Sequence, residues 1–213
     1  MEWRIAMAEK QLRKSEITKS KILRAAEAEF SEKGIWGARI DAIAESAGIN
    51  KRMIYEHYIS KEELYKTVLK EVYGRLAECE REFFAKDLSP EAALRNVVHV
   101  YFAFLEKNPS FVRILMWENL NNARYIDAVD PATLKNPAIE YIVAQIKRGK
   151  DKGVFRSDAD EYQLTLSLLN FEFSYFVNIH TMSYVLKTEL SEASEISKRA
   201  DFISDMIIKY LCV

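Results

Sequence analysis

The chain has 213 residues, 49% apolar and 30% charged, so it can bury a hydrophobic core and is too apolar to be a disordered chain. Its net charge is −1, so overall basicity cannot be used to argue for nucleic-acid binding. No apolar run approaches the roughly 18 residues of a membrane span. Because Cys79 and Cys212 lie far apart and the N-terminus lacks the apolar core of a signal peptide, we expect a cytoplasmic protein without disulfides.

Positive charge is concentrated near the N-terminus. Residues 10–24 contain six lysines and arginines and a single acid, Glu16, which gives a local charge of +5. A charge run of this kind is most often a solvated helix face, so it admits a nucleic-acid partner without identifying one.

Four helices are predicted in the first third of the chain. Apolar residues at helical spacing indicate a first helix over about 18–33, ended by Gly34 as a left-handed cap. A short second helix carries Ile40, Ile43, Ala44 and Ala47 on one face and stops at Gly48, and a third covers about 50–58. Ser60 followed by Glu63 is a capping box that opens a long fourth helix with no glycine or proline from 61 through 73.

The prolines indicate where later helices begin. Each follows a residue that caps helices well, namely Ser89, Asn108, Asp130 and Asn136. Further helices are predicted at about 90–106, 109–123, 137–150, 159–186 and 194–211. Since the chain has no sustained alternation and no hairpin signal, we expect an all-α fold.

The helix predicted over 159–186 has two apolar faces. One contains Leu164, Leu168, Phe171 and Tyr175, and the other contains Leu166, Leu169, Phe173 and Phe176. An ordinary surface helix has a single apolar stripe, so two faces indicate burial on two sides. We expect a second copy of the chain as the partner, in a two-fold four-helix interface; the alternative is a helix internal to a monomer.

The segment 38–61 fits a helix-turn-helix, in which two short helices flank the turn at Gly48 and the second helix enters the major groove. We expect Asn50 and Arg52 to read bases, while Tyr55 and Lys61 bind phosphates. The alternative is a helical hairpin whose polar face is only solvated. The outward face of the second helix is expected to show Asn50, Lys51, Arg52, Met53, Tyr55 and His57.

Several dispersed residues resemble the TetR family of bacterial repressors. They are Phe30–Gly34, Ile43-Ala44, Ala47–Ile49, Ile54-Tyr55, His57-Tyr58 and Ser60–Leu64. The resemblance implies an N-terminal three-helix DNA-binding domain, here 1–63, and a larger helical domain, 64–213, that dimerises and binds a small-molecule effector. Segments 111–120 and 152–156 also resemble the branch that includes the pyrimidine-utilisation regulator.

Three positions depart from the family pattern. Arg39, after Ala38, stands near a site that usually holds serine or threonine, so a cation replaces a hydroxyl at the phosphate contact. Arg52 replaces a frequent glycine. Glu56 would repel phosphate, so we expect it to accept from a cytosine amine or to face Lys51 or Arg52.

We expect no enzyme, metal or cofactor. The three histidines are dispersed, and the metal-binding patterns E-x-x-H, H-E-x-x-H and paired C-x-x-C are absent from the sequence, as is a glycine-rich phosphate loop. An effector pocket in an all-helical domain combines apolar walls with a few polar groups. The candidate lining residues, each of which also suits a plain core role, are Phe102, Trp117, Glu118, Asn121, Tyr125, Phe171 and Tyr175.

The leading hypothesis is a homodimeric repressor that a small-molecule effector releases from a double-stranded DNA operator. The alternative is an architectural or protein-recruiting DNA-binding protein of the same fold without an effector. An open, partly polar pocket favours the first, and a pocket filled by the protein's own side chains favours the second.

Overall fold

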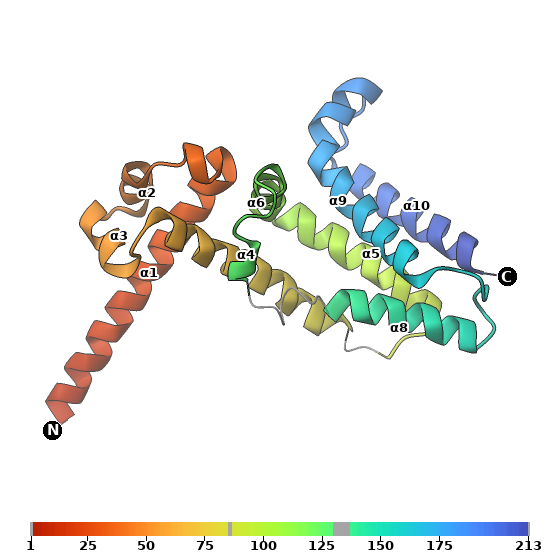
Figure 1. Cartoon of the computed structure of the whole chain (residues 1–213), viewed down its shortest axis with the longest axis horizontal. Coiled ribbons are helices and arrows are strands. Elements are labelled where there is room, and N and C mark those ends of the chain that lie inside the picture. The colour runs from red at the N-terminus through yellow and green to blue at the C-terminus, as the bar shows by residue number, and fades with distance from the viewer. Residues whose placement is uncertain (1, 85–86, 130–136, 213) are drawn as a thin grey trace. The chain divides into compact units, whose positions relative to one another are not determined.

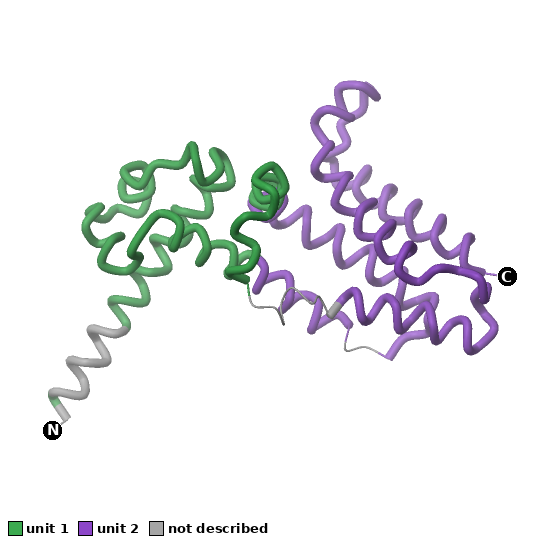
Figure 2. The backbone as a smooth tube through the Cα atoms, viewed as in Figure 1, with its two compact units in different colours: residues 1–72, 113–129 green, residues 73–112, 130–213 purple. Residues whose placement is uncertain are grey.

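A computed structural model describes residues 2–84, 87–129 and 137–212, with the side chains of 2, 4–12 and 137 left out. Apart from one isolated bridge between Phe155 and Cys212, the regular structure in these ranges is helical, which confirms the all-α prediction (Figure 1). The chain forms two compact units, residues 1–72 with 113–129 (unit 1) and residues 73–112 with 130–213 (unit 2), coloured separately in Figure 2.

Unit 1 contains the three predicted N-terminal helices. Helix α1 (Glu2–Gly37) is followed by α2 (Ile40–Ala47) and α3 (Lys51–His57), and α4 (Lys61–Phe84) begins in the same unit. The start of α1 lies well before the predicted residue 18, because the preceding stretch is rich in alanine, lysine, glutamate and glutamine, which favour helix without an apolar stripe. Gly34 is a kink inside α1 (φ 63°, ψ 177°) and not the predicted helix end.

The core of unit 1 is the one that the helical periodicity predicts. Ile22, Phe30 and Ile43 are fully buried, and Ile54 brings the short α3 onto them. The Phe30 ring meets the edge of Tyr65 on α4 at a centroid distance of 5.0 Å. These contacts place α3 with one face in the core and its other face in solvent.

Unit 2 is also built from helices. Its helices are α5 (Pro90–Lys107), α8 (Pro137–Asp151), α9 (Glu161–Leu186) and α10 (Ala193–Leu211). Helix α6 (Pro109–Leu120) stops three residues before its predicted end, since Asn122 and Ala123 both have a positive φ of 55°, and a 3-10 turn follows at Ile126–Ala128. Ser89 caps α5 as predicted, accepting from the Ala92 N–H, whereas Asp130 and Asn136 lie outside the described residues.

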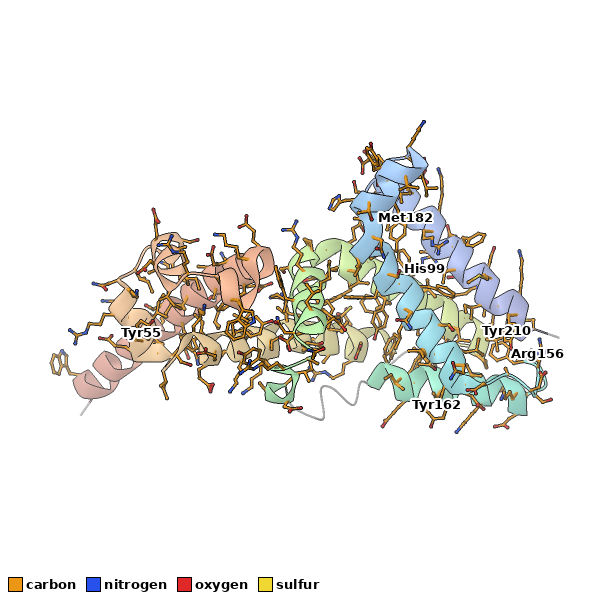
Figure 3. All side chains as sticks on the ribbon, turned by 45° about the horizontal axis from the view of Figure 1, so that its top comes forward. Tyr55, His99, Arg156, Tyr162, Met182 and Tyr210 are labelled. Carbon is orange, nitrogen blue, oxygen red and sulfur yellow. The ribbon has the colours of Figure 1, made fainter. Side chains whose placement is uncertain are left out.

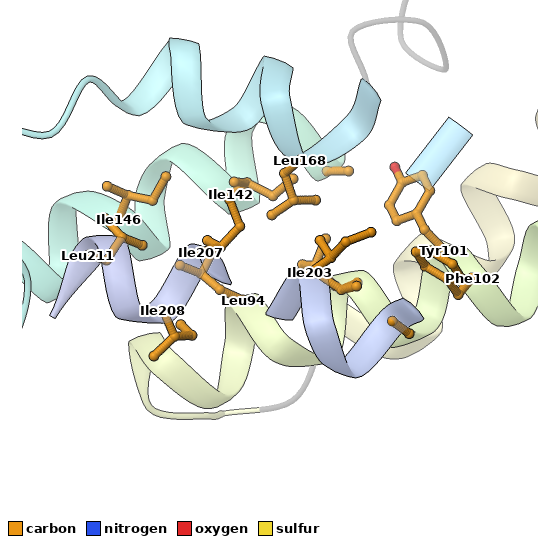
Figure 4. Close-up of a cluster of buried hydrophobic side chains, with 14 of the residues drawn as sticks. Leu94, Tyr101, Phe102, Ile142, Ile146, Leu168, Ile203, Ile207, Ile208 and Leu211 are labelled. Carbon is orange, nitrogen blue, oxygen red and sulfur yellow. The ribbon is translucent and has the colours of Figure 1, made fainter. Parts of the chain in front are cut away.

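Branched apolar side chains from α5, α8, α9 and α10 form the core of unit 2 (Figure 4). The predicted stripe of α10 is confirmed, because Ile196, Ala200, Ile203 and Ile207 are all buried. On α9, Leu168 is buried whereas Leu166, on the other predicted face, is 55% exposed. The two faces of α9 therefore have different environments within a single chain.

Helices α4 and α6 contribute to both units. The division passes along α4 after Val72 and along α6 after Val112. The expected domain boundary at 63/64 remains a prediction about folding domains, and the contact-based units divide the chain further along α4. None of the helices in the described ranges is both long and apolar enough to cross a membrane.

Candidate nucleic-acid interface and ligand groove

The turn between α2 and α3 has the geometry that a helix-turn-helix requires. Gly48 is left-handed (φ 64°, ψ 39°), and the Ile49 N–H donates to the Ala44 carbonyl at 3.0 Å. Asn50 caps α3, with its Oδ1 accepting from the Arg52 N–H at 2.9 Å. The predicted base reader Asn50 therefore also sets the start of the recognition helix.

The recognition helix α3 exposes most of the predicted DNA-contacting residues. Ile54 and Tyr58 are buried, so the opposite face is directed to solvent. Arg52 and Tyr55 lie on that exposed face, while Met53 and His57 are half-buried at its margins. The helix thus presents cationic, aromatic and apolar groups together, which are the kinds of group that contact bases and phosphates in a major groove.

The two leading cations of α3 are held by acidic neighbours. Lys51 pairs with Asp41 of α2 at 2.9 Å, and this hydrogen bond raises the pKa of Lys51. Arg52 pairs with Glu56 at 3.1 Å, which is one of the arrangements predicted for that glutamate. Water screens exposed pairs of this kind, so phosphates and bases can displace the carboxylates at little cost.

Arg39 and Lys61 each make a hydrogen bond at the start of α2. Arg39 is the N-terminal flanking residue of α2, its own side chain makes no cap, and its N–H donates to Glu29 at 3.1 Å. The Lys61 ammonium donates to the Ala38 carbonyl at 3.2 Å. Two cations therefore stand beside the free N–H groups of an eight-residue helix, an arrangement that favours a phosphate.

Glu29 fixes this end of α1 against α2. Its side chain is only 11% exposed and also accepts from Lys33 at 2.9 Å. Burial opposes ionisation of the Glu29 carboxyl, but Lys33 and the Arg39 N–H outweigh it and lower its pKa. The carboxylate therefore stays charged and holds the N-terminal end of α2 in place.

Four of the seven effector candidates lie in unit 1, where they tie α6 to α1 and α4. The Glu118 carboxylate accepts from the Tyr65 hydroxyl at 2.8 Å and from the Tyr125 N–H at 3.0 Å. Trp117 donates to the Ser31 carbonyl at 3.2 Å. Asn121 accepts from the Trp36 indole at 3.0 Å, so all four candidates already have partners within the unit.

The other three candidates lie in unit 2. Phe102 is buried in the core and its ring lies 5.6 Å from that of Tyr175. Phe171 and Tyr175 line a groove of about 510 Å³ between α9 and α10. Ser174, a polar residue within the apolar run of α9, also lines the groove. The remaining lining residues, which the sequence did not indicate, are Asn178, Met182, Leu186, Leu190, Glu195, Lys198, Arg199 and Phe202.

Two carboxyl groups are buried in unit 2. Glu172 on α9 is 1% exposed, neither of its oxygens has a hydrogen-bond partner among the described residues, and burial raises its pKa well above the usual range. Glu80 on α4 is equally buried and accepts from the Tyr101 hydroxyl at 2.5 Å. Burial raises the pKa of Glu80 to about 7, although the tyrosine hydrogen bond acts in the opposite direction. The sequence contains a signal for each of these buried acids. Glu172 interrupts an apolar run, and Glu80 lies one turn after Leu76 on the apolar stripe of α4.

Groups suited to metal or thiol chemistry are sparse in the described ranges. No three histidine, cysteine, aspartate or glutamate side chains there lie close enough to hold a metal ion together. Both cysteines are free thiols, and burial raises the pKa of Cys79, which makes it a poor nucleophile.

Two family models match the chain. Residues 22–68 match the model described as bacterial regulatory proteins, tetR family. Residues 90–207 match the model described as tetracyclin repressor-like, C-terminal domain. Together they span both the helix-turn-helix and most of unit 2.

The chain is also similar to individual proteins, two by sequence and one by fold. The transcriptional repressor NicS of Pseudomonas putida is 32% identical over 195 residues, which is 91% of this chain and 92% of NicS. The transcriptional regulator RutR of Escherichia coli K12 is 31% identical over 105 residues, 49% of each chain. The crystal structure of the regulator FadR from Bacillus subtilis with stearoyl-CoA superimposes with a TM-score of 0.70 at 16% identity, covering 90% of this chain and 98% of FadR.

Proposed function

Since the chain belongs to the TetR family of bacterial transcriptional regulators, we propose that this DNA-binding regulator is a repressor that a small-molecule effector releases from its operator. The geometry of the α2–α3 turn supports DNA binding most directly. After the turn, α3 directs one face to solvent, and Arg39 and Lys61 lie at the N-terminal end of α2 before it. Repression rests on the relative with 92% coverage, which is named a repressor. The absence of catalytic activity and a cytoplasmic location belong to the same proposal.

The DNA contacts follow from the site. Arg39 and Lys61 bind a phosphate at the start of α2, and Tyr55 binds a second phosphate from α3. Arg52 reads a base after leaving Glu56, since an arginine can donate to both O6 and N7 of guanine. The other proposed contacts from α3 and its cap are Asn50, Lys51, Met53 and His57.

A second copy of the chain covers the exposed apolar stripes of α9 and α10. Tyr162 on α9 and Tyr210 on α10, both labelled in Figure 3, belong to these stripes. The exposed stripe of α9 comprises Tyr162, Leu166, His180 and Tyr184, and that of α10 comprises Phe202, Met206 and Tyr210. Two such faces related by a two-fold axis form a four-helix interface, and the dimer then reads half-sites about 34–36 Å apart or a multiple of that distance.

The effector binds within unit 2, beside Phe171 and Tyr175. The groove there is open and combines aromatic walls with an amide and charged groups, which favours an effector over the alternative of an architectural protein without one. Effector binding is transmitted along α4 and α6, because each of these continuous helices belongs to both units. A coupling free energy of about 1–3 kcal/mol is typical, and operator DNA must weaken effector binding by the same factor.

Selection of bound sequences from a random duplex pool tests this function. We expect an inverted repeat, and Lys61→Ala should weaken binding to all duplexes alike and reduce the salt slope by about one unit per subunit. Arg52→Ala should cost about 1–3 kcal/mol on the preferred site and relax one position. Selected DNA without inverted symmetry, or equal losses on specific and random DNA for both variants, would contradict the assignment.

A further inference from the structure

A second basic surface lies on α1, outside the helix-turn-helix. Arg13, Lys14, Lys21 and Arg24, which we call the α1 basic face, are all exposed. At about 100° per residue these four positions lie within about 100° of each other around the helix, and Lys19 points to the opposite side. One helix face therefore concentrates four positive charges.

Among the side chains that the structure describes, no carboxylate neutralises these charges. None of the four side chains makes an ion pair or a hydrogen bond with another described residue. Elsewhere in unit 1, Lys33, Lys51 and Arg52 each pair with a carboxylate. The α1 basic face is thus an unsatisfied positive surface beside a DNA-binding motif.

Three of its members also line a groove. Arg13, Lys21 and Arg24 border a hollow of about 740 Å³ between α1 and the C-terminal end of α2. Small side chains make up much of the rest of the lining, namely Ala25, Ala28, Ser46 and Ala47. Among the described lining residues, Glu16 is the one acid. A groove lined by small side chains and bordered by arginine and lysine suits the phosphate backbone of a nucleic acid.

The groove is adjacent to the recognition helix. Its α2 wall ends at Ala47, and α3 begins four residues later at Lys51. The N-terminal end of a recognition helix is the end that enters the major groove, so flanking phosphates pass close to it. In Figure 1 the N-terminal half of α1 extends out past α2 and α3.

We propose that the α1 basic face binds phosphates of the duplex that flanks the bases read by α3, which lengthens the contact of each subunit beyond its half-site. This inference rests on the proposed DNA-binding function. It concerns a different part of the chain, because Arg13, Lys14 and Lys21 precede the range 22–68 that matches the family model and Arg24 lies at its start. Arg13 and Arg24 are eleven residues apart, about 16 Å along a helix, which corresponds to about five phosphates of one strand at about 3.4 Å each. The contact is independent of sequence because it involves only phosphates.

The test compares two duplexes that carry the same selected operator. The short duplex ends one base pair beyond each half-site, and the long one has ten further base pairs of arbitrary sequence on each side. Affinity is measured by fluorescence anisotropy between about 50 and 200 mM KCl. The test variant is Arg13→Gln/Lys21→Gln/Arg24→Gln. Lys19→Gln, on the opposite side of α1, is the control, and it is matched in charge to Arg13→Gln alone; glutamine preserves helix propensity in each.

On the long duplex we expect the triple variant to lose at least about tenfold in affinity at about 100 mM KCl. Its salt slope should fall by about 2–5 units, corresponding to roughly two to six lost phosphate contacts per dimer. On the short duplex, and for Lys19→Gln on either duplex, the change should stay below about threefold. Replacing the flanking sequence should leave the long-duplex affinity unchanged.

Equal affinities of wild type and triple variant on the long duplex would overturn the inference while leaving operator recognition intact. Equal losses on both duplexes would also overturn it, because the face would then act through the operator itself. If the wild type shows no preference for the selected operator, the proposed function fails as well. Should the triple variant lose helical circular dichroism, Arg13→Gln alone, farthest from the buried Ile22, should still reduce the long-duplex slope by about two units.

Discussion

Of the glycine-to-alanine substitutions in unit 1, Gly34→Ala should destabilise the protein most. Gly34 kinks α1 at φ 63° and ψ 177°, a backbone region that L-residues essentially avoid. A Cβ atom at this position would stand 2.7, 2.8 and 3.0 Å from three atoms of the Trp117 ring. Backbone strain and steric overlap therefore act at one residue.

The size of the effect follows from these two contributions. The backbone strain costs about 1–3 kcal/mol, and overpacking against the indole costs about a further 1–3 kcal/mol because Trp117 is held by its hydrogen bond to Ser31. Gly48 supplies the comparison, since its φ is 64° but nothing lies within 4 Å of its missing Cβ. Gly48→Ala should therefore cost only about 1–2 kcal/mol.

Urea unfolding followed by circular dichroism, at one fixed protein concentration, measures both costs as shifts of the midpoint at constant slope. A double-mutant cycle with Trp117→Leu isolates the overlap, because the smaller side chain removes the ring and leaves the backbone strain. We expect Gly34→Ala to cost at least about 1 kcal/mol less when it is combined with Trp117→Leu than in the wild type. Equal costs in both backgrounds would refute the view that the indole closes over Gly34.

Two buried carboxyls give further predictions. The pKa of Glu80 is raised from 4.5 to about 7 in the folded protein, so protonated Glu80 favours folding. Its contribution to the free energy of unfolding is complete below about pH 4.5 and is lost as the pH rises to about 7, a change of roughly 3 kcal/mol. Unfolding at pH 5, 6, 7 and 8 should show this slope flattened in Glu80→Gln, and an identical slope in the variant would argue against a protonated Glu80. Glu172→Leu should stabilise the effector-free protein by about 1–3 kcal/mol at pH 7, since an unpartnered carboxyl leaves the core, whereas Glu172→Gln should gain little. A destabilised leucine variant would show that Glu172 has a partner in solution.

Local chemistry accounts for what could be predicted. The boundaries of α2, α3, α5 and α10 follow from apolar periodicity together with caps such as Asn50 and Ser89. The left-handed Gly48 and the i,i+4 pair of Arg52 with Glu56 also depend only on neighbouring residues. Such features are determined by the residues within one or two turns, so the sequence contains them.

Long-range contacts decided the rest. Trp117 and Glu118 have the character of pocket residues, but they bind Ser31 and Tyr65, more than fifty positions earlier. These bonds fix the C-terminal part of α6 in unit 1. The same indole lies against Gly34, where the sequence indicated an ordinary helix end and the structure has a kink within α1. On α9, periodicity identified two apolar faces but not which one the chain would bury, because that depends on the positions of α5, α8 and α10. By itself the sequence determined the helices and the DNA-reading motif; tertiary packing alone decided which aromatic and acidic side chains are neighbours, because spacing along a helix does not specify what packs against it.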